Sequence, residues 1–220
     1  MGIVLASYSL TDQAYDIIKE KIISKEFPPG MRLIDSQLAK DYGISRTPLR
    51  DAIRKLNEDG LVANCPNRGF CVFQPTQKDI NEIFEIRLMM DKAAATKLIN
   101  DILPSNKEAY DTIEGFYTSF QQQNNLDVAN ESFVKADEDF HDKVVLMIDN
   151  ERFYNFYVEI RNQTRAFRKK TSGDKERRAK AFLHHEKICR GFLNLDLDQT
   201  IKALSEHIEL SRNDALADFQ

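Results

Sequence analysis

The sequence has no run of apolar residues long enough to cross a bilayer as a helix, which takes about 20 residues. Residues 2–10 also lack the basic flank and the small-residue cleavage pattern of a secretory signal peptide. These absences exclude a membrane-spanning helix and a recognisable export signal. We therefore expect a cytoplasmic protein that makes no membrane contact.

Cysteine is scarce too. The sequence has three cysteines, Cys65, Cys71 and Cys189, and none of them forms a Cys-x-x-Cys pair. An odd number of cysteines without metal-type spacing does not indicate a disulfide framework or a zinc ribbon. The default expectation is free thiols in a reducing compartment.

Tryptophan is absent, and glycine and proline become rare from Thr76 onward, where long segments show helical periodicity. A chain of 220 residues with 42% hydrophobic residues exceeds one typical domain. We predict a mainly α protein with two domains, residues 1–75 and 76–220. The second should be an all-α antiparallel bundle, because the predicted loops are short. Its expected helices lie near residues 77–100, 105–123, 127–149, 151–171, 174–194 and 197–217.

The first domain contains a short segment with its own start and stop signals. Gly43 and Gly60 bound a predicted helix in which Ser45 can cap the first turn. Its arginines recur every fourth residue and share one face: Arg46, Arg50 and Arg54. Such a face is often merely solvated, but it can also contact nucleic acid.

The neighbouring residues favour nucleic acid. A second short helix, which we expect Asp35 to cap, precedes Gly43 and completes a helix-turn-helix. Two predicted strands, residues 61–65 and 70–73, flank a tight turn at residues 66–69. This arrangement predicts an N-terminal winged helix-turn-helix, whose recognition helix fits the major groove of double-stranded DNA.

The net charge of −4 is concentrated in the second domain, because residues 1–76 contain ten Lys and Arg against nine Asp and Glu. A positive field for DNA would therefore be local to the predicted recognition helix.

Three histidines of the second domain continue apolar stripes: His141, His185 and His207. Asp137 precedes His141 by one helical turn and shares its face. Each residue alone is more often a satisfied core or surface group than a ligand. Together, three imidazoles and a carboxylate could hold a divalent metal ion, with Zn, Ni, Mn and Fe all permitted by the ligand types. His184 falls off its stripe and is expected to face solvent.

The first domain resembles the GntR family of regulators. The similarity is carried by these segments: Pro28 to Leu33, Leu38-Ala39, Ser45 to Arg50, Leu56, Gly60 to Val62 and Arg68 to Val72. It implies that Arg46, Thr47 and Arg50 contact operator DNA, with Arg68 and Gly69 at the wing tip. Ser36 stands where some members carry a DNA-contacting Arg, and Asp35 stands where Glu is usual. We include Ser36 and Ser45 among the predicted DNA-binding residues.

The second domain resembles the FCD ligand-binding domain of the FadR subfamily. The similarity is carried by these segments: Ile86 to Leu88, Asp137 to His141, His185 to Ile188 and Leu204 to Ile208. It implies that Asp137, His141, His185 and His207 ligate a metal, whereas acyl-CoA-sensing members lack these ligands. Asp91 replaces the usual Glu after Arg87.

We predict that Arg87 and Arg165 bind an effector, a small organic acid, through charge-assisted hydrogen bonds. The alternatives are an ion pair between Arg87 and Asp91 for the first arginine and a solvated cationic face for the second.

The function predicted from the sequence is a ligand-responsive transcriptional regulator, a homodimeric repressor released from a palindromic operator by the effector. One alternative keeps DNA binding but gives the helical domain only a dimerising role, with a structural metal. An alternative of another class is a metal-dependent hydrolase. No nucleophile elbow, phosphate loop or His-Glu-x-x-His motif accompanies the ligands, so we do not expect an enzyme.

Overall fold

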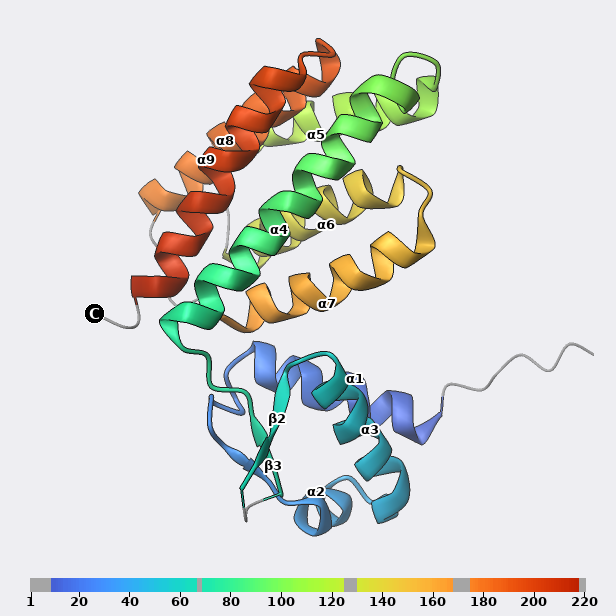
Figure 1. Ribbon diagram of the computed structural model, residues 1–220, viewed down its shortest axis with the longest axis vertical. Coiled ribbons are helices and arrows are strands. Elements are labelled where there is room, and N and C mark those ends of the chain that lie inside the picture. The colour runs from blue at the N-terminus through green and yellow to red at the C-terminus, as the bar shows by residue number, and fades with distance from the viewer. Residues whose placement is uncertain (1–8, 67–68, 125–129, 168–174, 218–220) are drawn as a thin grey trace, which may run out of the picture. The chain divides into compact units, whose positions relative to one another are not determined.

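The computed structural model describes residues 9–66, 69–124, 130–167 and 175–217. The chain forms two compact units (Figure 1). Unit 1 contains Met1–Thr76 together with Asn162–Phe167, and unit 2 contains Gln77–Arg161 and Arg168–Gln220. Because α7 (Glu151–Phe167) crosses this division, the same helix contributes residues to both units.

Unit 1 is a winged helix-turn-helix. Its elements are α1 (Leu10–Ile23), β1 (Arg32–Leu33), α2 (Asp35–Asp41), α3 (Arg46–Glu58), β2 (Val62–Cys65) and β3 (Gly69–Val72). The strands form an antiparallel sheet in the order β1-β3-β2. One apolar face of α3, built from Leu49, Ile53 and Leu56, is fully buried in the core of unit 1. The opposite, arginine-bearing face is therefore left to solvent.

The structure adds two elements of unit 1 that the sequence analysis did not predict. Helix α1 begins after Ser9, whose side chain accepts a hydrogen bond from the Asp12 backbone N–H, and it buries Ala14, Ile18 and Ile22. Strand β1 pairs with β3, Arg32 opposite Cys71. The cap and the four-residue apolar spacing were visible signals for α1.

Two local predictions in unit 1 were wrong. Asp35 does not cap α2, because it is the first helical residue and Ile34 occupies the cap position without a side-chain hydrogen bond. Cys65 and Cys71 form a disulfide. In the described part of the chain only Cys189 is a free cysteine, and it is buried. The hairpin register explains the disulfide. Cys65 lies opposite Gly69, so Cys71 is its diagonal neighbour on the same face, with Cα atoms 6.0 Å apart.

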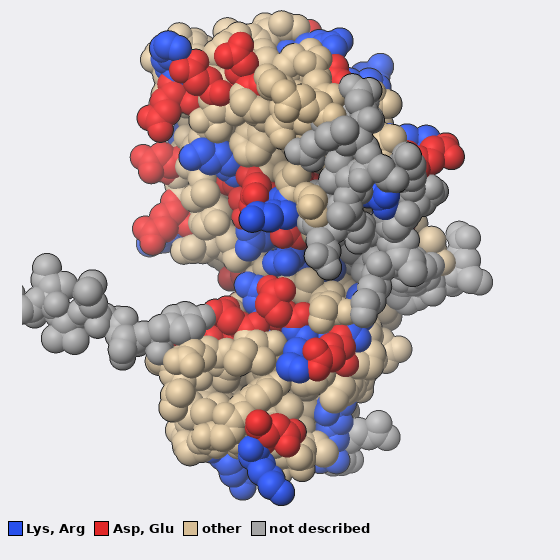
Figure 2. Space-filling model, turned by 180° about the vertical axis from the view of Figure 1, so that it is seen from behind, with Lys and Arg blue, Asp and Glu red and all other residues tan. Residues whose placement is uncertain are grey.

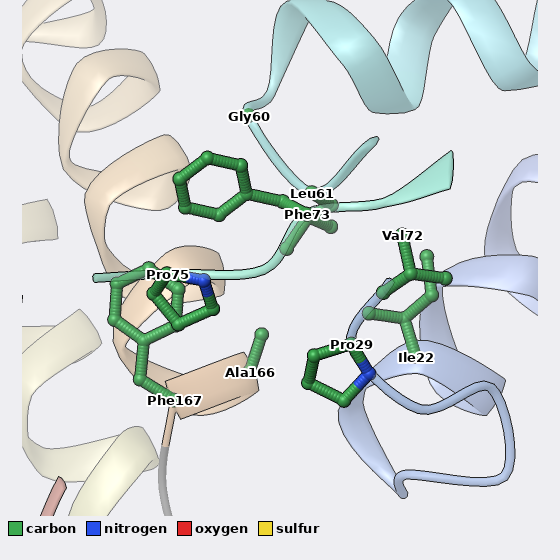
Figure 3. Close-up of a pocket in the computed structure, with 9 residues that line it drawn as sticks. All are labelled: Ile22, Pro29, Gly60, Leu61, Val72, Phe73, Pro75, Ala166 and Phe167. Carbon is green, nitrogen blue, oxygen red and sulfur yellow. The ribbon is translucent and has the colours of Figure 1, made fainter. Parts of the chain in front are cut away.

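Unit 1 also encloses a small apolar pocket (Figure 3). Ile22 of α1 and Leu61, Val72 and Phe73 around the strands line it together with the end of α7. The Phe73 and Phe167 rings lie 6.1 Å apart. The described residues that line this pocket have no charged or polar side chain that could orient a ligand.

Unit 2 is helical. Its remaining elements are α4 (Gln77–Lys97), a π-helical turn η1 (Leu98–Ile102), α5 (Lys107–Asn124), α6 (Asn130–Leu146), α8 (Lys175–Leu193) and α9 (Leu197–Leu216). Helix α9 packs against α4 and α8, and α8 packs against α5 (Figure 1). The predicted fold class, a winged helix-turn-helix followed by an all-α bundle, is confirmed. Helices α6, α8 and α9 carry the histidines toward one core.

Candidate functional site

Four side chains meet inside unit 2. Asp137 and His141 come from α6, His185 from α8 and His207 from α9, and all four are buried. Their potential ligand atoms all lie within 4.8 Å of one another. The structure thus brings together the four residues that the sequence analysis singled out as metal ligands.

The three imidazoles approach the carboxylate through the same ring nitrogen. The distances from Asp137 Oδ1 to Nε2 are 3.2 Å for His185, 3.3 Å for His207 and 4.0 Å for His141. The Nε2 atoms of His141 and His207 lie 3.1 Å apart. In a tetrahedral site with metal–ligand bonds of about 2.0–2.1 Å, ligand atoms are about 3.3 Å from one another. The spacing of this donor set therefore fits a divalent metal ion.

Aromatic rings surround the four side chains. The Phe120 ring stacks on His185 with centroids 4.7 Å apart, and the Phe140 ring meets both His185 and His141 edge-on. Burial, followed by the proximity of His185, lowers the pKa of His207 well below its usual range. A histidine with this shift is neutral at pH 7, which is the form that ligates metals.

Two buried charged residues of α4, Arg87 and Asp91, lie near this histidine cluster. Asp91 Oδ1 lies 3.7 Å from His141 Nδ1, and Asp91 Oδ2 lies 3.5 Å from Arg87 Nε. Burial alone would raise the pKa of Asp91, but the adjacent His141 and Arg87 outweigh it and hold the pKa below its usual value. A carboxylate on the Nδ1 side of a histidine favours the tautomer that leaves Nε2 available for a metal.

Arg87 is fully buried beside Tyr157 of α7. Burial would lower the pKa of Arg87, but the neighbouring Tyr157 and Asp91 outweigh burial and raise it above its usual value. Arg87 therefore carries a fixed positive charge beside Asp91, consistent with either predicted role, the ion pair with Asp91 or the contact with an anionic effector.

Arg165 lies in the part of α7 that belongs to unit 1, where its Nη1 lies 3.9 Å from Glu20 Oε1. His184 is half-buried rather than solvent-facing, and burial followed by the nearby Lys187 lowers its pKa.

The predicted DNA-reading residues lie on the exposed side of the helix-turn-helix. The exposed residues are Ser36, Ser45, Arg46, Thr47, Arg50 and Gly69. Ser45 stands at the N-cap position of α3 but its side chain makes no capping hydrogen bond, contrary to expectation. Gly69 has φ +73°, a conformation that favours glycine at the wing turn. Arg68 lies outside the described residues.

Asp35 contacts two of these arginines. Its Oδ2 lies 3.1 Å from Arg46 Nη2 and 3.2 Å from Arg50 Nε. The hydrogen bond from Arg46 is the main cause that lowers the pKa of Asp35. Figure 2 shows basic and acidic side chains lying side by side on unit 1, rather than a uniformly basic surface. Positive charge on α3 is thus local, as the charge count of the sequence indicates.

A winged helix-turn-helix followed in one chain by a helical unit with a buried ligand-type cluster is the architecture of a DNA-binding transcriptional regulator. Residues 10–72 match the family described as bacterial regulatory proteins, gntR family, and residues 82–210 match the FCD domain. The chain belongs to the GntR family of bacterial regulatory proteins and carries an FCD domain. The resemblance stated from the motifs is confirmed.

Known proteins of this kind share part of the sequence. An uncharacterised helix-turn-helix transcriptional regulator of Bacillus subtilis is 28% identical over 67% of this chain and 65% of its own length. A regulator of Agrobacterium vitis, from the TAR-I ttuE-ttuC' intergenic region, is 31% identical over 66% of this chain and 84% of its own. The match thus covers slightly less than two thirds of the Bacillus protein. The matched relatives are transcriptional regulators, not enzymes.

The fold also matches a solved structure. Escherichia coli McbR superimposes with a TM-score of 0.77, covering 96% of this chain and 99% of that one, at 16% identity. This likeness shows that the two proteins share the fold. No helix in the described ranges is long and apolar enough to cross a membrane.

The sequence did not predict which side chains surround the four site residues. The aromatic rings around the histidines were not predicted, although Phe140 directly precedes His141. The approach of Asp91 to His141 was not predicted either, because the two residues are 50 positions apart on different helices. Their contact depends on how α4 packs against α6.

Proposed function

We propose that this protein is a homodimeric transcriptional repressor whose unit 2 binds a small carboxylate at a metal centre and then releases operator DNA. In this proposal residues 1–75 read DNA, and residues 76–220 bind the effector and form the dimer. The observation that carries the proposal is the convergence of Asp137, His141, His185 and His207 around one point. Three imidazoles and one carboxylate are a common ligand set for a divalent metal.

The effector class follows from the charges at the site. A divalent metal held by these four residues would supply an electrophilic centre that a carboxylate oxygen can ligate. Arg87 adds a buried positive charge beside Asp91, the neighbour of His141, and could donate hydrogen bonds to the rest of an organic acid. Arg165 remains a predicted contact of the effector.

DNA recognition is assigned to α3 and the wing. Arg46, Thr47 and Arg50 lie exposed in the first turns of α3, the part of a recognition helix that contacts base edges. An arginine can donate two hydrogen bonds to guanine O6 and N7. Ser36, Ser45, Arg68 and Gly69 complete the proposed DNA surface, and a dimer would read a palindromic operator with one α3 in each half-site.

Regulation requires coupling between the two sites. An effector that binds better to the DNA-incompetent arrangement must weaken DNA binding by the same factor, typically 1–3 kcal/mol. We place the hinge at residues 74–78, between β3 and α4. The repressor polarity is taken from the family resemblance.

The metal content of tag-free protein tests the proposal. We expect about one divalent ion per chain in the wild type by elemental mass spectrometry, and none in His207→Ala. His184→Ala is the matched control, because this half-buried neighbour is outside the ligand group and should leave the ion in place. If no variant binds metal even after zinc or nickel is added, the metal-centred effector site is wrong.

The second stage measures DNA. A duplex is selected with the wild-type protein from a random library, and citrate, malate and acetate are titrated into the complex. We expect a carboxylate to release the duplex from the metal-loaded protein and not from His207→Ala. A metal that binds while none of these carboxylates changes DNA affinity would reduce the ion to a structural role in a dimerising domain.

A further inference from the structure

A single carboxylate joins the two arginines that we propose to read the operator. Asp35 Oδ2 lies 3.1 Å from Arg46 Nη2 and 3.2 Å from Arg50 Nε, and Asp35 Oδ1 lies 3.2 Å from Arg46 Nη2. The side chains of Arg46 and Arg50 are 62% and 65% exposed, whereas that of Asp35 is 23% exposed. Asp35 is therefore the less exposed partner in both pairs.

We propose that Asp35 is a positioning residue for sequence discrimination. It holds the side chains of Arg46 and Arg50 in place, so that both can contact the edges of the bases. The inference rests on the proposed DNA-reading role of α3. Arg50 faces Asp35 through Nε, so its two terminal Nη groups are the ones that can reach a guanine. Arg46 faces Asp35 through one Nη and has its other N–H groups for DNA.

Two physical effects give this contact a role in specificity. Free arginine side chains lose rotamer freedom when they are fixed, and a partner that holds them before binding reduces that loss. A negative charge close to the DNA surface also repels phosphates, which weakens binding that is independent of sequence. Both effects widen the difference between operator and unrelated DNA.

Asp35→Asn tests the inference because it keeps the shape of the side chain and removes the charge. The probes are the duplex selected by the wild-type protein and a scrambled duplex of the same length, at one fixed salt concentration. We expect Asp35→Asn to bind the scrambled duplex more tightly and the selected duplex more weakly. The ratio of the two affinities should fall about tenfold or more.

Asp51→Asn is the matched control. Asp51 lies on α3, the helix that carries Arg46 and Arg50, and pairs with exposed Arg54 at 2.7 Å, so the substitution removes the same charge without touching Arg46 or Arg50. It should raise affinity for both duplexes by a similar factor and leave their ratio unchanged. Asp35→Glu, which retains the charge, should keep a ratio closer to that of the wild type than Asp35→Asn does.

The outcomes separate the inference from the proposed function. Arg50→Ala should lose affinity for the selected duplex, and if it does not, the DNA-reading surface itself is wrong. If Arg50→Ala loses affinity while Asp35→Asn keeps the same ratio as Asp51→Asn, the positioning role is overturned and the DNA-reading surface stands. An increase in affinity for both duplexes by equal factors in Asp35→Asn would also overturn it, because Asp35 would then only repel phosphate.

Discussion

Each unit contains an aspartate that pairs with arginine, but the pair of unit 1 is exposed to solvent and the pair of unit 2 is buried. In unit 1, Asp35 meets arginines that are more than 60% exposed, whereas in unit 2 the side chains of Arg87 and Asp91 are each 2% exposed. An exposed pair contributes little to the free energy of unfolding, because water and salt compete with it. A buried pair must stay complete, because a lone charge in the core is strongly unfavourable.

The surroundings of the two pairs differ in the same way. Asp91 interacts with His141 and Tyr157, and both of these residues are buried in unit 2. Around Asp35, the α3 surface stays open. The comparison shows that one chain can place the same pair of residue types on an exposed surface and in a buried core.

The largest expected effect is at the buried pair. Asp91→Ala leaves Arg87 charged without its carboxylate, so the free energy of unfolding should fall by about 3–5 kcal/mol. Denaturation in urea with a metal chelator present measures the change without a contribution from metal. Asp111→Ala is the control, because Asp111 forms an exposed i,i+4 pair with Lys107 at 2.8 Å. Equal, small losses in both variants would contradict the contrast between buried and exposed pairs.

Metal should stabilise unit 2 next most strongly. At a free metal concentration of 100 times Kd, a ligand that binds only the folded state adds about 2.7 kcal/mol to the free energy of unfolding. Denaturation with zinc or with chelator should show this difference for the wild type. His207→Ala should unfold alike in both conditions. The same zinc response in His207→Ala would mean that zinc binds elsewhere.

The exposed arginines should affect DNA binding and leave the fold intact. Arg50→Ala should weaken binding to the selected duplex by about 1–3 kcal/mol, because a bidentate contact to guanine is lost. Fluorescence anisotropy measures the affinity, and circular dichroism checks the helix content. Arg54→Ala is the comparison variant, because Arg54 lies one turn further from the helix start and pairs with Asp51. Identical losses in the two variants would indicate only a general phosphate attraction.

The smallest effect is expected where an exposed pair has no proposed function. Lys55 of α3 and Asp12 of α1 form an ion pair of 2.7 Å, with side chains 49% and 41% exposed. Lys55→Ala should leave the urea midpoint of unit 1 nearly unchanged, because solvent screens the pair. A double substitution with Asp12→Ala measures their coupling. A coupling as large as that of Arg87 with Asp91 would show that exposure does not govern the strength of these pairs.

Local sequence rules predicted much of the architecture. Periodicity placed Leu49, Ile53 and Leu56 on the buried face of α3 and the arginines on the other face, and the structure has both. The same rule placed His141, His185 and His207 on apolar stripes, and all three are buried. These features depend on positions within one helix, which the spacing of residues fixes.

Predictions of helix caps and of cysteine pairing were less accurate. Asp35 was expected to cap α2, but it lies one position later and contacts α3 instead. Cys65 and Cys71 were expected as free thiols until the register of β2 and β3 placed them on one face. A cap shifts with a single residue of helix boundary, and a cross-strand neighbour depends on register. Neither is fixed by the residue types alone.

The sequence by itself determined which helical faces carry arginine, histidine or apolar side chains, because helical periodicity links each face to a residue spacing. Only the tertiary structure decided which of those faces meet. Asp137 and His141 share α6, but His185 and His207 join them through the packing of α8 and α9, and Asp91 approaches from α4. Such contacts depend on side-chain packing between segments far apart in the chain, which no local pattern records.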